Sequence, residues 1–313
     1  MKGFIVALLA CCALSGAAYG QSPVTVIWAH PPTGSYYWDV YAAEDLGYFA
    51  QEGIRVEDVN TDSPSQTMQM LVTQTVTVVS MSSEVAITAV EKGADAVVVG
   101  VENARVGWSL MVRPEIRGYA DLRGKTLGVA QLKEASGTML KLLLEKNGVK
   151  PNEYEVIPLG GTPNRYAAML KGAIAATVLT PPTDFIAAAA GMKKLGDTFE
   201  AFAGAGVFFM VQRSWAQKYP DVITKFLRAT ARSALWLHDP ANRARANEIL
   251  MKRYKISKED AEKNYDSVIL TNILSARSNL TDATIQPWLD LRSSKDAPGR
   301  YYDATYLGRA QKR

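Results

Sequence analysis

The sequence predicts an α/β protein of two doubly wound α/β lobes, joined by two crossover segments and followed by a helical C-terminal part. Short apolar segments rich in β-branched residues alternate with helix-like segments over residues 24–101, and the alternation restarts over residues 126–190. Such alternation is typical of a parallel sheet with helices on both faces. From Ser214 onward the periodicity is mostly helical. We therefore expect two sheets, with the C-terminal helices packed back on the first.

The first alternation is bounded by strong helix signals. Asp62 or Ser63 can cap a helix that begins at Pro64, a residue suited to the first helical turn, and Gly93 ends the next helix. The predicted strands are residues 24–29, 54–60, 76–80 and 96–101, and the predicted helices are residues 36–50, a helix from Pro64, and residues 82–92.

The second alternation is a smaller copy of the first. Its predicted strands are residues 126–130, 155–159 and 176–179, and its helices are residues 137–147, 164–171 and 183–190. An extended segment over residues 107–112 precedes it and a strand over residues 207–211 follows it. The predicted C-terminal helices are residues 214–219, 220–237, 240–253, 257–270 and 281–291.

A helical tail that follows a complete second lobe packs most simply on the first lobe. The chain then crosses between lobes twice, near residues 108–113 and near residues 206–212. We assign residues 21–110 and 210–313 to lobe I and residues 111–209 to lobe II.

Residues 1–20 have the features of a secretory signal peptide. Lys2 precedes an apolar run from Phe4 to Leu14, and small residues follow up to a cleavage site after Gly20. The apolar run is too short to span a membrane. A lipoprotein-like signal ends at Cys11, so a form that is lipid-anchored at Cys11 is the alternative. Either form is exported, and we expect a periplasmic protein.

Composition excludes several classes of site. Both cysteines, Cys11 and Cys12, lie inside the signal segment, and only His30 and His238 supply imidazoles. A mature chain without cysteine lacks the parts of common zinc sites and thiol nucleophiles, so we expect no metal, no cofactor and no catalytic residue. The formal charge of +4 is spread along the chain without a basic stripe, which argues against a nucleic-acid partner. We expect a monomer.

Ligands of α/β sheets bind at the loops that follow the carboxyl ends of the strands. Residues 131–138 form such a loop and open a helix, whose first N–H groups are unpaired and can cradle a ligand. The run Tyr36-Tyr37-Trp38 supplies rings that can stack on a flat solute, although three consecutive helical residues cannot all face one cleft. We expect ligand contacts from Ser35, Tyr36, Tyr37, Trp38, Ser63, Ser82, Ser83, Glu84, Asn103, Ser136, Gly137, Thr138, Thr180 and Pro181.

The charged residues near this edge leave the charge of the solute open. Glu84 and Glu102 would accept hydrogen bonds from an amine, amide or hydroxyl and would repel an anion. Arg105 and Arg165 could instead supply a positive group. Arg165 lies in the first turn of a predicted helix, where the helix dipole disfavours a cation, so we expect it to have a partner, more often a protein carboxylate than a ligand.

Several blocks of the chain resemble one family of transport proteins. The run from Ala43 to Ile54, AEDLGYFAQEGI, is similar to a helix-to-strand passage in the solute-binding proteins of nitrate, sulfonate and taurine ABC transporters. Residues 121–129, Gly160 to Arg165 with Ala168 to Gly172, and Tyr302 to Leu307 are similar in the same order. Where that family usually has an aspartate after the glycine of the third helix, this chain has Ala173.

The resemblance implies an exported protein with the two-lobed fold of type II periplasmic binding proteins. Such a protein captures a small organic solute in a cleft that closes between its lobes and delivers it to the membrane permease of an ABC importer. Two alternatives stay open: an enzyme of pyrimidine-synthase type on the same fold, which would need a cysteine-rich motif, and an extracytoplasmic ligand sensor.

Overall fold

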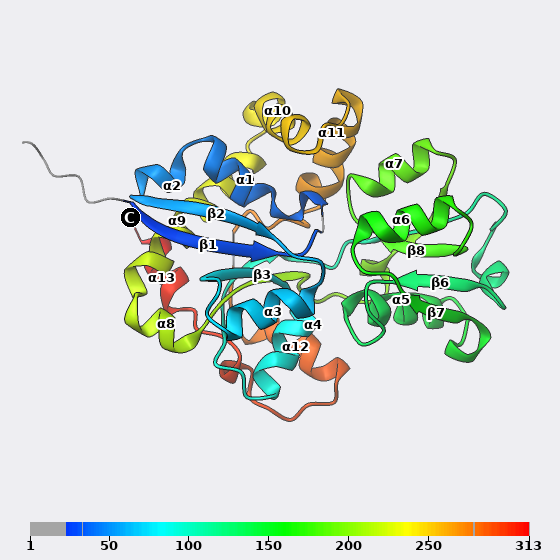
Figure 1. The fold of residues 1–313 in the computed structure, drawn as a ribbon, viewed down its shortest axis with the longest axis horizontal. Coiled ribbons are helices and arrows are strands. Elements are labelled where there is room, and N and C mark those ends of the chain that lie inside the picture. The colour runs from blue at the N-terminus through cyan, green and yellow to red at the C-terminus, as the bar shows by residue number, and fades with distance from the viewer. Residues whose placement is uncertain (1–22, 33, 278, 313) are drawn as a thin grey trace, which may run out of the picture.

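The computed structural model describes residues 23–32, 34–277 and 279–312, which form two five-stranded sheets (Figure 1). The predicted signal peptide lies outside these residues. The first sheet has the order β2-β1-β3-β10-β4, and its strands are β1 (Val24–His30), β2 (Ile54–Asn60), β3 (Val78–Ser82), β4 (Val97–Asn103) and β10 (Val207–Val211). The second has the order β7-β6-β8-β5-β9, and its strands are β5 (Ser109–Val112), β6 (Thr126–Val129), β7 (Glu155–Pro158), β8 (Ala176–Leu179) and β9 (Lys193–Asp197).

Helices cover both sheets, as the alternation predicts. Those on and around the first sheet before the crossing are α1 (Trp38–Asp45), α2 (Tyr48–Gln51), α3 (Pro64–Val72) and α4 (Ser83–Glu91), after the one-turn 3₁₀ helix η1 (Gly34–Tyr37). The second sheet carries α5 (Ala135–Lys146), α6 (Thr162–Leu170) and α7 (Thr183–Ala189). The C-terminal part contains α8 (Arg213–Lys218), α9 (Pro220–His238), α10 (Arg243–Tyr254), α11 (Lys258–Tyr265), α12 (Asp282–Leu291) and α13 (Thr305–Gln311).

The two-lobed α/β architecture predicted from the sequence is confirmed, but one strand in each sheet runs against the others. In the first sheet β1 is parallel to β2 and β3, whereas β10 is antiparallel to β3 and β4. In the second sheet β6 is parallel to β7 and β8, whereas β5 is antiparallel to β8 and β9. Both reversed strands are the first that the chain forms after changing sheets. A chain that leaves one sheet at its carboxyl edge and enters the facing carboxyl edge of the other must run backwards there.

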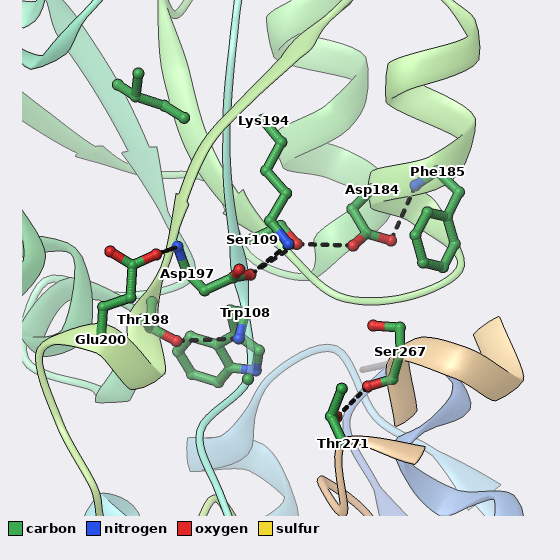
Figure 2. Close-up of polar contacts among 12 residues, drawn as sticks. Trp108, Ser109, Asp184, Phe185, Lys194, Asp197, Thr198, Glu200, Ser267 and Thr271 are labelled. Carbon is green, nitrogen blue, oxygen red and sulfur yellow. Dashed lines mark hydrogen bonds and ion pairs between the residues drawn. The ribbon is translucent and has the colours of Figure 1, made fainter. Parts of the chain in front are cut away.

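The sheet changes occur at residues 104–108 and 198–206, just before the crossings expected near residues 108–113 and 206–212. Thr198 ties the two crossings together. Its hydroxyl donates to Val106 O at 2.8 Å, and it exchanges hydrogen bonds with Trp108 through both backbone and side chain (Figure 2). The boundaries assigned from the sequence, 110/111 and 209/210, fall inside β5 and β10, and that division into lobes stays a prediction.

A polar cluster anchors β5 where the first crossing enters the second sheet. Figure 2 shows that Ser109 donates to Asp184 Oδ2 of α7 at 2.8 Å and that Lys194 Nζ lies 2.7 Å from Asp197 Oδ1. Burial raises the pKa of Asp184 to about 6. Ser109 Oγ also lies 3.4 Å from Asp197 Oδ1, so the start of β5 contacts both α7 and the edge strand β9.

The C-terminal helices pack on the first sheet, as the sequence predicts (Figure 1). Phe226 of α9 stacks on Phe49 of α2 with ring centroids 5.5 Å apart, and Val98 of β4 donates its N–H to Tyr301 O at 3.0 Å. Among the described residues, none of the helices has the length and apolar character that a membrane crossing requires.

Three elements differ from the sequence prediction. The helix expected over residues 36–50 is divided into η1, α1 and α2, because Gly47 adopts φ 71°, which interrupts the helical path. The strand β9 was not predicted, since its sequence KKLGD lacks apolar alternation and its side chains are largely exposed at the sheet edge. The short helix α13 was not predicted either.

Candidate functional site

A pocket lies between the facing carboxyl edges of the two sheets. The empty space in it is about 600 Å³ including the part open to solvent, of which about 50 Å³ can hold the centre of a water-sized sphere. The first sheet and the crossing supply Pro31, Pro32, Tyr36, Tyr37, Asp62, Pro64, Ser82, Trp108 and Val207, and the second sheet supplies Ala130, Glu134, Ala135, Ser136, Gly161, Thr162, Arg165 and Thr180. Both lobes therefore contribute to one site.

Aromatic rings form much of the pocket wall. Tyr36 and Tyr37 project from η1, where the chain turns after β1, and Trp108 ends the first crossing. The hydroxyl of Tyr36 donates to Gly107 O, and burial raises its pKa well above the usual value. A neutral, fixed ring of this kind can stack on a planar solute at little entropic cost.

Three helices begin at the pocket without a side-chain cap. The pocket-lining residues Ser82, Glu134 and Gly161 occupy the N-cap positions of α4, α5 and α6, and none of them caps its helix through its side chain. The first N–H groups of a helix have no intrahelical partner and carry the positive end of the helix dipole. The pocket thus has hydrogen-bond donors on both lobes for a ligand rich in acceptor oxygens or nitrogens.

Arg165 is a buried cation in the pocket wall. Its side chain donates to Gly160 O at 2.6 Å, to Val178 O at 3.0 and 3.3 Å and to Thr162 Oγ1 at 3.1 Å. We expected a carboxylate as its more frequent partner, but among the described residues none forms an ion pair with it. Burial lowers the pKa of Arg165 to about 10, so the guanidinium remains charged at neutral pH. A guanidinium has five N–H donors, and one on Nη1 is left for a ligand.

Glu134 is a buried carboxyl in the same pocket wall, and sequence reasoning missed it. Its exposed fraction is 6%, and Oε1 accepts a hydrogen bond from Ser65 Oγ at 2.5 Å. Its Oε2 is buried and has no hydrogen-bond partner in the described part of the chain. Burial raises the pKa of this carboxyl. Its position directly before α5, in the loop already expected to cradle a ligand, was a signal that could have identified it.

Hydrogen bonds already join the two lobes beside the pocket. Ser65 of α3 contacts Glu134, and Thr138 of α5 donates to Glu84 Oε1 of α4 at 2.9 Å. On the other side, the backbone N–H of Ser35 donates to Pro181 O at 3.0 Å. The walls are thus held in contact around the site.

The structure brings five of the residues predicted from the sequence into the pocket wall: Tyr36, Tyr37, Ser82, Ser136 and Thr180. Ser82 Oγ is buried without a partner, whereas Ser136 Oγ accepts the N–H of Ala130 at 2.8 Å and thereby fixes the loop before α5. As ligand contacts these five residues stay predictions.

Three predicted residues lie instead in the core around η1. Trp38 is fully buried and its ring packs edge-on against Tyr265 at 6.0 Å. Ser35 Oγ donates to Asn264 Oδ1 at 2.7 Å, and Asn103 Nδ2 donates to the carbonyl of Tyr36 at 3.1 Å. These side chains pack around η1 and do not line the pocket.

The remaining predicted residues surround the pocket without lining it. Ser63 caps α3 by accepting the N–H of Gln66 at 3.3 Å. Ser83 begins α4 and is buried, while Glu84 and Thr138 bond to each other across the lobes. Gly137 has no room for a side chain, because a Cβ would lie 2.7 Å from a backbone oxygen, and Pro181 contributes its carbonyl to Ser35.

No group of three or more histidine, cysteine, aspartate or glutamate side chains is placed to hold a metal ion within the described ranges. The pocket offers hydrogen bonds, a guanidinium, a carboxyl and aromatic faces. This arrangement can bind and orient a small polar molecule.

Comparison with known proteins assigns the family. A family model described as NMT1/THI5 like matches residues 35–244, which is most of the chain and includes every strand of both sheets except β1. The chain belongs to the NMT1/THI5-like family. Comparison with curated proteins found no match.

Solved structures share the fold of this NMT1/THI5-like protein. The alkanesulfonate-binding protein SsuA from Xanthomonas axonopodis pv. citri aligns with a TM-score of 0.76 and 16% identity over 91% of this chain and 100% of its own. The nitrate-binding protein NrtA from Synechocystis PCC 6803 aligns with a TM-score of 0.80 and 13% identity, over 92% of this chain and 88% of its own. A ligand-binding component of an ABC-type import system from Staphylococcus aureus aligns with a TM-score of 0.77 and 12% identity, over 93% of this chain and 100% of its own. These neighbours are ligand-binding proteins, one of them a component of an import system, and this chain shares their type II periplasmic binding protein fold.

Proposed function

We propose that this protein is an extracytoplasmic solute-binding protein that captures a small organic solute between its lobes and delivers it to the permease of an ABC importer. The observation that carries the proposal is the pocket itself. Both lobes contribute to it, three helices begin at it without side-chain caps, and Ser82 and Glu134 present buried polar atoms that have no hydrogen-bond partner among the described residues. The import-system proteins among the neighbours support the same role.

The enzyme alternative is less well supported by the pocket. The described residues that line it include neither a cysteine nor a histidine, so the pocket wall offers no thiol or imidazole for catalysis. The sensor alternative shares the same binding step and differs only in the membrane partner. Reconstitution with the permease and ATPase of an ABC importer would separate the two, because only a transport subunit stimulates ATP hydrolysis when loaded.

The binding step can be tested by thermal unfolding of the purified mature chain. A panel of sulfonates, aromatic carboxylates, pyrimidines and small amines covers the chemistry of the pocket. A solute at 100 times its dissociation constant stabilises the folded state by about 2.7 kcal/mol. For a chain of this size we expect the melting temperature to rise by roughly 5–10 °C.

A matched pair of variants places the site. Ser82→Ala removes a hydroxyl that lines the pocket and has no protein partner, so it should weaken solute binding while stability stays the same. Ser63→Ala removes the cap of α3 outside the pocket and should lower stability by about 1 kcal/mol with affinity unchanged. A panel in which no compound shifts the melting temperature, or the reverse behaviour of these variants, would contradict the proposal.

A further inference from the structure

The pocket contains a buried carboxyl oxygen that the protein itself leaves without a hydrogen bond. Oε2 of Glu134 has no partner among the described residues, although the side chain is 6% exposed and its other oxygen is held by Ser65. A buried acceptor without a donor is destabilising, and for a carboxylate the cost is larger than for a neutral group. Because Glu134 lines the pocket, a bound ligand can supply the missing donor.

The charge of the pocket wall points the same way. Its ionisable side chains, apart from tyrosine, are Asp62, Glu134 and Arg165, which gives two carboxyls against one guanidinium. Arg165 is occupied mainly by backbone carbonyls and does not form an ion pair with Glu134. A simple anion such as nitrate carries acceptors only, so it would offer no donor to Oε2 of Glu134.

On the basis of the proposed function, we infer that Glu134 determines specificity and that the solute carries a nitrogen donor, an amino, amidine or ammonium group, bonded to Glu134 Oε2. A second group on the solute presents an acceptor to Arg165 and to the uncapped N-terminus of α6. The rings of Tyr36 and Trp108 line the same pocket and cover the body of the solute. The solute therefore carries both a donor and an acceptor group, unlike an inorganic anion.

Isothermal titration with matched compounds tests this inference. The probes are three pairs that differ by one amino group: 4-aminobenzoate and benzoate, 2-aminoethanesulfonate and ethanesulfonate, and 4-aminopyrimidine and pyrimidine. A charge-assisted hydrogen bond in a buried site corresponds to about 10- to 100-fold in affinity. In wild-type protein we expect the amino member of at least one pair to bind more tightly by this factor. In Glu134→Gln the ratio of the affinity for the amino compound to that for its partner should fall at least tenfold.

Two control variants separate ligand contact from structure. Glu145→Gln makes the same chemical change on the exposed part of α5, where Glu145 contacts only Lys141 at 3.9 Å, and should leave the amino preference intact. Ser65→Ala removes the hydrogen bond to Oε1 across the lobes and should lower the affinities of both members of a pair together.

The outcomes distinguish this inference from the function on which it rests. Equal or tighter binding of the compounds without an amino group would overturn the role of Glu134 while solute binding stands. An amino preference that survives Glu134→Gln unchanged would do the same. A wild-type protein that binds no compound in these pairs or in the wider solute panel would overturn both.

Discussion

Replacement of Trp38 by alanine should unfold the protein more easily without changing its affinity for solute. The sequence predicts a ligand contact at this position, but the ring is fully buried and packs against Tyr265, outside the pocket. Truncation of a buried tryptophan to alanine costs about 3–5 kcal/mol, because the lost contacts leave a cavity. For a chain of this size that corresponds to a fall of roughly 6–20 °C in melting temperature.

Urea denaturation and calorimetric titration together decide the question. Trp38→Phe is the matched control: it keeps an aromatic ring, removes the buried and unpartnered Nε1, and should cost clearly less than the alanine variant. Both variants should bind solute as tightly as wild type at temperatures where they are folded. If Trp38→Ala kept its stability and lost affinity more than tenfold, the ring would be a ligand contact and our placement of the pocket would be wrong.

Three further perturbations follow from buried polar groups. Arg165→Met removes the guanidinium from the carbonyls that it bonds and should lower the unfolding free energy by about 2–5 kcal/mol; an unchanged urea midpoint would contradict this. Thr198→Val removes the hydroxyl that hydrogen-bonds to Val106 and Trp108, and it should lower the unfolding free energy by about 1–3 kcal/mol. Urea denaturation measures this change, and an unfolding free energy equal to that of wild type would contradict the prediction. Burial raises the pKa of Asp39 to about 7 and that of Glu102 well above its usual value. Because a raised pKa means that the folded state holds protons which the unfolded state releases, stability should fall as pH rises from about 4 to about 7. Asp39→Asn should make the unfolding free energy depend less on pH over this range. The same pH dependence in the variant and in wild type would refute the assignment to Asp39.

Hydrophobic pattern and helix signals were enough to predict most of the elements. Buried strands such as β8 and β10 are short runs of apolar residues with few alternatives, and the predicted residues 176–179 and 207–211 match them fully. The directions of β5 and β10 could not be predicted in this way, because a buried strand has the same apolar pattern whichever way it runs. Their reversal follows only from the path of the chain between two facing sheets.

The site was harder to predict than the fold, because its residues are assembled from loops far apart in the sequence. The loops were predicted correctly as groups, since the carboxyl ends of parallel strands share an edge, and this placed Ser82, Ser136 and Thr180 near one another. Which side chain of a run faces the pocket depends on the local path of η1. There the chain directs Tyr36 and Tyr37 into the wall and buries Trp38.

Glu134 and Arg165 show why charge in a sequence does not reveal what a pocket binds. Arg165 was expected to find a carboxylate, yet it is bonded by carbonyls that only the folded β8 and the loop before α6 bring to it. Glu134 precedes a helix, where a carboxylate is favourable for the dipole alone, so its sequence position is explained without any ligand. Only the folded chain shows that one oxygen is occupied by Ser65 and that the other is buried without a donor. The specificity of the pocket therefore depends on which hydrogen bonds the protein leaves unmade, and this is a property of the packed loops rather than of any one residue type.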